Sequence, residues 1–155
     1  MQPIKKTYFT VGPSQLYPGL VKMMNEALGD NVASISHRSD DFRKIYQQTK
    51  LALISLLKLP ANCQVFFLGS SIEIMEKIII SCVKQNCVHF VNGAFGEKFY
   101  ETAIINNKKA RKINYGGDGF KAEELRFPKE TEMICLTQNE TSTGVAIPVT
   151  VINKL

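Results

Sequence analysis

The fold is decided by one strand and the loop that follows it: Cys87-Val88-His89-Phe90-Val91, then Asn92-Gly93-Ala94-Phe95-Gly96. The short apolar run and the two glycines after it indicate a buried strand that turns at once toward a helix. Similar strand-and-loop segments are predicted at Gln64 to Leu68 before Gly69-Ser70-Ser71, at Arg111 to Tyr115 before Gly116 to Gly119, and at Glu132 to Thr137 before Gln138 to Val145. Helices are predicted from Ile72 to Cys82, from Ala94 to about Asn107 and around Ala122 to Leu125. This alternation predicts an α/β fold, three-layer α/β/α with a mainly parallel sheet and right-handed crossovers.

Two further helices are predicted earlier in the chain. One opens at Tyr17-Pro18 and ends at Gly29, with apolar residues at helical spacing between them. The other begins after Ser39, a side chain suited to capping a helix N-terminus, and carries one apolar stripe from Phe42 to Leu57. His89, inside an apolar strand, is predicted to be a hydrogen-bonded core histidine and not a catalyst.

Composition and charge are those of a single globular domain. The 155 residues are 45% apolar, and the net charge is +5. The densest basic patch runs from Lys108 to Lys112 and is interpreted as a solvated connection between a helix and a strand. No aromatic residue is interleaved there to stack on bases, so no nucleic acid is expected as a partner.

The four cysteines, Cys63, Cys82, Cys87 and Cys135, form no metal-ligand pattern, so no metal site is predicted. Three of them lie in apolar stretches, where free thiols behave as small hydrophobic side chains. The first residues lack the apolar core of a signal peptide, and no apolar run approaches the length of a membrane span. We therefore expect a cytoplasmic chain without a membrane partner.

Two of the glycine-bearing loops could bind a ligand. Gly69-Ser70-Ser71 offers backbone amides and two hydroxyls at a helix N-terminus, which suits a phosphate, although a plain serine N-cap would have the same sequence. Phe95 could stack on a planar ligand, but taken alone it is more typical of the apolar face of the next helix.

Two more segments could contact a ligand. His37-Arg38 could bind a carboxylate or phosphate through the guanidinium fork, although a surface arginine before a helix is common. The segment from Gln138 to Val145 is a polar, glycine-containing stretch after a buried strand. In an open α/β sheet such strand ends are where ligand contacts gather.

Taken in order, these segments resemble the class V, fold type I pyridoxal-phosphate enzymes, most closely the phosphoserine aminotransferases. Ile35 to Phe42 is similar to that family's I-S-H-R-S-x-x-F segment, Phe9 to Pro13 to its F-x-x-G-P opening, and Asn139 to Val145 to its N-E-T-x-x-G segment. Asn92 to Glu97 looks nearer to the alanine–glyoxylate branch. The resemblance covers nearly the whole chain.

The resemblance implies pyridoxal 5'-phosphate as cofactor and assigns roles by position. Gly69, Ser70 and Ser71 would hold the cofactor phosphate, Phe95 would stack on the pyridine ring, and Thr141 would hydrogen-bond the cofactor. His37 and Arg38 would bind the phosphate of the substrate, which in this family happens across the interface of a homodimer. The substrates implied are an amino acid and a 2-oxo acid, in serine biosynthesis.

The catalytic lysine is not assigned, because no lysine here matches the family's Schiff-base lysine motif. We therefore expect the N-terminal part of an aminotransferase, with an incomplete large domain at 15–155 and a small-domain segment at 1–14, and an inactive chain on its own. The phosphate cradle is less glycine-rich than is usual in phosphoserine aminotransferases, and Phe95 stands where they usually have tryptophan. An alanine or serine–glyoxylate aminotransferase, or a non-catalytic phosphate-binding chain, are the alternatives.

Overall fold

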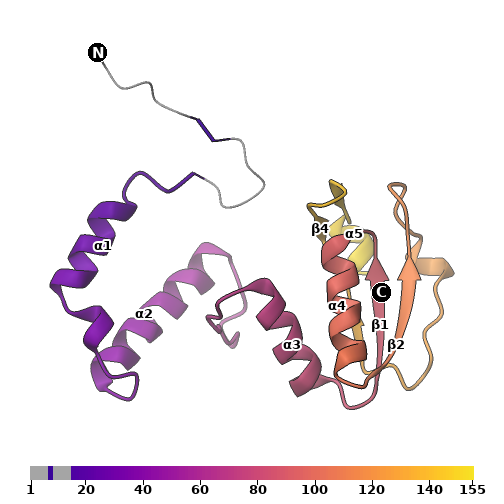
Figure 1. Cartoon of the computed structure of the whole chain (residues 1–155), viewed down its shortest axis with the longest axis horizontal. Coiled ribbons are helices and arrows are strands. Elements are labelled where there is room, and N and C mark those ends of the chain that lie inside the picture. The colour runs from indigo at the N-terminus through magenta and orange to yellow at the C-terminus, as the bar shows by residue number, and fades with distance from the viewer. Residues whose placement is uncertain (1–6, 9–14) are drawn as a thin grey trace. The chain divides into compact units, whose positions relative to one another are not determined.

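A computed structural model describes residues 7–8 and 15–155, and the predicted F-x-x-G-P segment therefore lies outside the described residues. The chain divides into two compact units, Met1–Phe67 and Leu68–Leu155. Each is described by itself, with its elements labelled as in Figure 1.

The first unit contains the two helices predicted from periodicity. They are α1 (Leu20–Gly29) and α2 (Asp40–Leu56), with a 3₁₀ turn η1 (Val32–Ser34) between them. Ser39 caps α2 as predicted, because its hydroxyl accepts a hydrogen bond from the Phe42 amide at 3.2 Å. Asp40 and Asp41 lie in the first turn, where negative charge is stabilised by the helix dipole. The helix α1 begins at Leu20, two residues after Pro18.

The strand predicted from Gln64 to Leu68 is wrong. These residues form a loop without regular secondary structure, and the side chain of Phe66 is 78% exposed. A strand needs a neighbour to pair its backbone groups, and none of the strands in the described residues pairs with this segment. The loop is instead held to α2, because the Tyr46 hydroxyl donates to the Val65 carbonyl at 2.5 Å and its ring meets Phe67 edge-on.

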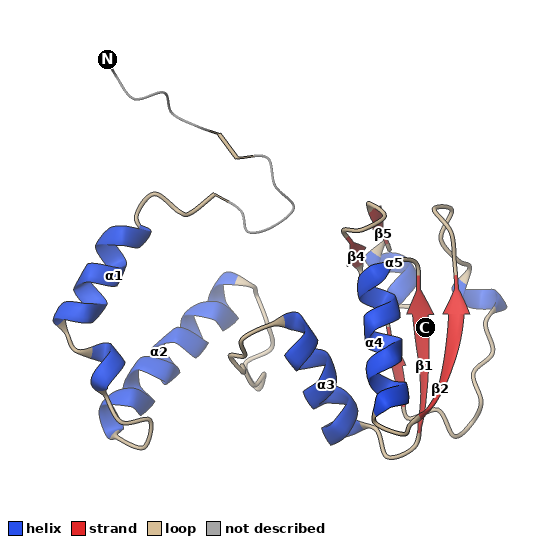
Figure 2. Ribbon diagram, viewed as in Figure 1, coloured by secondary structure: helices blue, strands red, loops and turns tan. Residues whose placement is uncertain are grey.

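The second unit confirms the predicted parallel sheet. Its strand order is β2-β1-β3, and β1 is the parallel neighbour of both other strands (Figure 2). The order of elements along this unit is α3 (Ser71–Cys82), β1 (Asn86–Val91), α4 (Ala94–Ile105), β2 (Lys109–Asn114), η2 (Ala122–Glu124), β3 (Met133–Cys135), β4 (Asn139–Glu140), β5 (Val145–Ala146) and α5 (Val149–Ile152). The predicted strands at 111–115 and 132–137 are thus shifted or shortened, and the helix at 122–125 is a single 3₁₀ turn.

Two packed layers cover β1. On one face α3 and α4 pack together over a core that includes Ile79, Cys87 and Ala103. On the other face the buried ring of Phe90 contacts the rings of Phe120 and Phe127, which come from the loop after β2. None of the helices in the described part of the chain is long and apolar enough to cross a membrane.

His89 is a core histidine, but only half of the prediction is confirmed. It is 1% exposed, its Nε2 lies 3.2 Å from the Cys87 sulfur, and its ring meets Phe99 edge-on. No hydrogen-bond partner of its Nδ1 lies among the described residues, so only one of the two ring nitrogens has the polar contact that was predicted. Burial lowers the pKa of His89 to about 4, which keeps the ring neutral at physiological pH.

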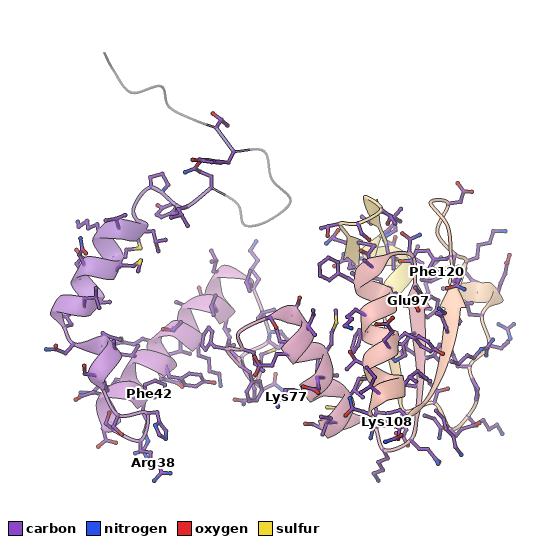
Figure 3. All side chains as sticks on the ribbon, in the orientation of Figure 1. Arg38, Phe42, Lys77, Glu97, Lys108 and Phe120 are labelled. Carbon is purple, nitrogen blue, oxygen red and sulfur yellow. The ribbon has the colours of Figure 1, made fainter. Side chains whose placement is uncertain are left out.

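The basic patch is not a loop, because Lys109 to Lys112 lie within β2. Two of its charges are used inside the unit. The Lys108 ammonium donates to the carbonyl of Val83 at 2.6 Å, at the C-terminal end of α3, and the Lys112 ammonium lies 2.9 Å from the Glu97 carboxylate. Figure 3 labels Lys108 and Glu97 in this unit. The cysteines in apolar stretches were predicted to behave as small hydrophobic side chains. Cys87 and Cys135 are buried, as this predicts, but Cys82 is exposed.

Candidate functional site

The N-terminus of α4 lies at the carboxyl end of β1. Gly93 is the residue before the helix and gives it no side-chain cap. Phe95 follows in the first turn with 38% of its surface exposed. Both α3 and α4 begin at the end of the unit where β1 and β2 end (Figure 1), which is where open α/β sheets bind ligands.

A two-stranded hairpin, β4–β5, meets this helix end and was not predicted. Its four-residue loop contains Thr141 and ends at Gly144, whose φ of +73° is favourable only for glycine. The Gly144 amide donates to the Glu140 carbonyl at 2.9 Å and closes the loop. Thr141 is exposed at the tip.

The carboxylate of Glu140 joins the hairpin to α4. It is 1% exposed, and one oxygen accepts from the Gly96 amide at 3.0 Å while the other accepts from the Ser142 hydroxyl at 2.5 Å. Burial alone would raise the pKa of the Glu140 carboxyl, but hydrogen bonds from Ser142 and from the amides of Gly96 and Phe95 outweigh it and lower the pKa below its ordinary value. Glu140 is therefore a charged, fully engaged acceptor.

Two further hydrogen bonds run between the same two segments. The Ser142 hydroxyl accepts from the Ala94 amide at 2.9 Å, and the Thr143 hydroxyl donates to the Asn92 side chain at 2.5 Å. The Asn92 amide group in turn donates to the Tyr115 carbonyl at 2.8 Å, after the end of β2. The loops after β1 and β3 are thus tied together.

Gly93 is required by this close approach. A Cβ built on Gly93 would lie 2.7 Å from Cγ and 2.8 Å from Cδ of Glu140. Its φ of −168° is extended backbone that any residue adopts, so the restriction is one of space. Of the two glycines in this loop, Gly93 is therefore the one that allows the hairpin to approach the helix.

A cavity of about 360 Å³ opens beside this junction. It is lined by residues at the carboxyl ends of β1 and β2 and by the first turn of α4, namely Val91, Asn92, Gly93, Ala94, Glu97, Asn114 and Tyr115. None of the residues predicted to bind cofactor or substrate lines it.

Gly69, Ser70 and Ser71 lie at the N-terminus of α3, where the sequence left two interpretations open. Ser70 caps the helix, since its hydroxyl accepts from the Glu73 amide at 3.2 Å. The Glu73 carboxylate accepts in return from the Gly69 amide at 3.0 Å, a reciprocal arrangement close to a capping box. The ordinary cap is therefore present, and the first amides of α3 remain without intrahelical partners.

His37 and Arg38 lie in the exposed turn before α2, in the other unit. The Arg38 amide donates to the Ser36 hydroxyl at 3.3 Å, and Figure 3 shows the Arg38 side chain extending away from the helix. The structure brings Phe95 and Thr141 into one hydrogen-bonded assembly and sets Ser70 at the same end of the unit. His37 and Arg38 belong to the first unit and are described there by themselves.

Sequence reasoning missed the residues that hold the assembly together: Asn92, Glu140, Ser142 and Thr143. Glu140 had a usable signal, because it lies inside the Asn139-Glu140-Thr141 segment, directly after a buried strand. A carboxylate in that place needs donors, and the loop after β1 provides them.

The described residues can be tested against pyridoxal phosphate. A phosphate suits the free amides at the start of α3, a planar ring suits the half-exposed Phe95, and a ring oxygen or phosphate suits the exposed Thr141 hydroxyl. One feature opposes this, because the Glu73 carboxylate occupies the Gly69 amide and a phosphate would have to displace it. With that one movement, the residues fit the group.

Comparisons with known proteins confirm the resemblance seen in the sequence. No family model matches the chain. The chain is 29% identical over 142 residues to a phosphoserine aminotransferase from Rhodococcus opacus, covering 91% of this chain and 38% of the relative. It is 29% identical over 161 residues to one from Lactococcus lactis, covering 90% and 43%.

Solved structures agree. A phosphoserine aminotransferase from Cytophaga hutchinsonii superposes with a TM-score of 0.89 at 45% identity, covering 96% of this chain and 41% of that one. An alanine–glyoxylate aminotransferase from Nostoc superposes with a TM-score of 0.70 at 25% identity, covering 88% and 36%. The α/β fold with a mainly parallel sheet, of the fold type I transferase kind, is therefore confirmed. The chain spans about two fifths of the length of these relatives.

Proposed function

We propose that this chain is the N-terminal part of a pyridoxal-phosphate-dependent aminotransferase that acts on phosphoserine and a 2-oxo acid in serine biosynthesis. The observation that carries the proposal is the match over 96% of the chain to a phosphoserine aminotransferase at 45% identity. The joined loops at the carboxyl ends of β1 and β3 support it, because they hold Phe95 and Thr141 where such a sheet binds ligands.

Each of the chain's own residues has a physical task in this proposal. Gly69, Ser70 and Ser71 bind the cofactor phosphate through the amides and dipole of α3. Phe95 covers one face of the cofactor ring and excludes water from it, and Thr141 donates a hydrogen bond that fixes the ring's orientation. The cofactor, when bound, supplies the electron sink that the transfer of an amino group requires.

His37 and Arg38 bind the phosphate of the substrate. A guanidinium forks onto two phosphate oxygens and remains charged at every relevant pH. In the proposed assembly they act across the interface of a cytoplasmic homodimer. Residues 1–14 belong to the small domain of the parent protein, residues 15–155 to its large domain, and the catalytic lysine lies outside this chain.

An alanine or serine–glyoxylate aminotransferase is the second candidate. It is favoured by the segment from Asn92 to Glu97 and by the similarity to the Nostoc structure. The two candidates differ in whether the substrate carries a phosphate.

The test is Arg38→Ala in the longer parent protein, with phosphoserine and alanine compared as amino donors. Loss of a charge-assisted pair of about 1.5–3 kcal/mol predicts a rise of roughly 10- to 150-fold in KM for phosphoserine, with cofactor affinity unchanged. Arg43→Ala is the matched control, because Arg43 is an exposed arginine close by, paired with Asp40 at 2.8 Å. Unchanged phosphoserine turnover, or faster turnover of alanine in the parent itself, would favour the second candidate.

A further inference from the structure

We propose that Glu140 is a positioning residue: its buried carboxylate fixes the Phe95 ring and the Thr141 hydroxyl in one arrangement, so that both contact the same cofactor. This inference rests on the proposed function and adds to it a residue that touches neither cofactor nor substrate.

The first support is connectivity. One carboxylate oxygen accepts from the Gly96 amide, the residue after Phe95, and the other accepts from Ser142, the residue after Thr141. Phe95 and Thr141, which are proposed to contact the cofactor, each directly precede a residue that donates a hydrogen bond to the Glu140 carboxylate. Phe95 and Thr141 lie 46 positions apart in the chain, so the backbone between them does not by itself hold them at a fixed distance.

The second support is charge. Among the described residues no lysine, arginine or histidine forms an ion pair with Glu140. Its charge is balanced by backbone amides, by the Ser142 hydroxyl and by the positive end of the α4 dipole. A buried carboxylate that is stabilised only by hydrogen bonds keeps its donors in place. Each donor that moves away leaves the buried charge with one hydrogen bond fewer, which costs free energy.

The third support is the shape of the contact. Gly93 leaves no room between its backbone and the Glu140 side chain, and a Cβ on Gly96 would lie 3.1 Å from the Phe90 carbonyl. The helix end is therefore packed against both β1 and the hairpin. A shift of the Glu140 carboxylate therefore displaces the Gly96 amide, which directly follows Phe95.

Glu140→Gln tests the role with little change in size. An amide group has one oxygen where the carboxylate has two, so its NH₂ must face either the Gly96 amide or Ser142. The Ser142 hydroxyl can turn to accept from the NH₂, but in either orientation one backbone amide, that of Gly96 or that of Ser142, loses its acceptor. Glu130→Gln is the matched control, since Glu130 is exposed and loses the same charge. Val88→Ala, a truncation of a buried β1 residue, serves as a control for lost stability alone.

The reporter is Phe95→Trp, because the chain contains no tryptophan and the introduced ring is then its only indole. The first readout, on this chain, is the decay of fluorescence anisotropy. In the Glu140→Gln background we expect a larger fast component from local motion of the ring, and none in the Glu130→Gln or Val88→Ala backgrounds. A general loss of stability would not produce this pattern.

The second readout uses the longer parent protein and pyridoxamine 5'-phosphate, which binds without forming a bond to lysine. Loss of one charge-assisted hydrogen bond predicts an affinity at least about tenfold weaker in Glu140→Gln than in either control. If Glu140→Gln fails to fold, Ser142→Ala replaces it, because it removes the hydroxyl that links Ala94 and Glu140 and keeps the charge.

The outcomes separate the two proposals. Equal ring motion and equal affinity in Glu140→Gln and the controls would overturn the role of Glu140 and leave the proposed function standing. A parent protein that binds no pyridoxamine phosphate would overturn the proposed function and, with it, the purpose assigned to Glu140, even if the ring motion changed as expected.

Discussion

Gly93→Ala should loosen the junction between α4 and the hairpin. The new methyl group would lie 2.7 Å from Cγ of Glu140, whereas ordinary van der Waals contact begins at 3.4 Å. The Glu140 side chain cannot simply swing aside, because its carboxylate is bound to Gly96 and Ser142. The substitution must therefore separate the hairpin from the helix or break these hydrogen bonds.

The magnitude follows from two opposed effects. Forcing extra volume into a packed site costs about 1–3 kcal/mol. Replacing glycine by alanine stabilises by about 0.4–1 kcal/mol through the unfolded state, because the extended backbone at Gly93 is open to alanine. We expect a net loss of roughly 1–2 kcal/mol in the free energy of unfolding of the second unit.

The assay is urea unfolding followed through the ¹⁵N amide resonances of β1, which report on the second unit alone. Gly117→Ala is the control, since a Cβ at Gly117 meets no atom within 4 Å. It should be neutral or slightly stabilising. Equal stability of the Gly93 and Gly117 variants would refute the packing argument and, with it, the close approach on which the site depends.

Two further predictions concern groups whose pKa the fold shifts. The pKa of His89 is lowered from 6.5 to about 4, so the unfolded state takes up a proton first and stability falls as the pH drops from 6.5 toward 4, by about 2 kcal/mol at pH 5. His89→Phe should lack this dependence in urea titrations at pH 7.5 and pH 5, and an equal loss in both proteins would contradict it. Hydrogen bonds from the amides of Gln85 and Lys84 hold the pKa of Glu132 below its ordinary value, so Glu132 stabilises the fold at neutral pH and less as the pH falls through that pKa. Glu132→Gln should lower the urea midpoint at pH 7, with the difference from the parent shrinking in acid; a difference independent of pH would show that the charge is not responsible.

The elements that sequence predicted well have local causes. The helix after Ser39 carries its own cap and acidic first turn, and the segment from Cys87 to Gly96 combines an apolar run with glycines at its end. Both patterns are complete within about ten residues, so no distant partner is needed to interpret them.

The elements that were predicted wrongly, or not at all, depend on residues far away in the sequence. The run from Gln64 to Leu68 has the composition of a strand, but a strand forms only where a neighbour pairs with it, and in the described residues Tyr46 binds the loop instead. The hairpin β4–β5 has two residues in each strand, too few for any periodic signal.

The candidate site divides in the same way. Phe95 and Thr141 were identified because they follow predicted strands and match family positions. Glu140 was missed because its burial depends on amides of α4 that lie more than forty residues away in the sequence. A charged side chain is normally exposed, and only the donors supplied by the fold make its burial favourable.

The lysine that binds the cofactor can be located by loading the longer parent protein with pyridoxal phosphate, reducing it with borohydride and mapping its peptides in a mass spectrometer. In the proposed function this chain provides only non-covalent contacts to the cofactor, with Phe95 and Thr141 on the hairpin–helix junction. We expect one stably labelled lysine, outside these 155 residues. No stable label, or a label on a lysine of this chain, would contradict it.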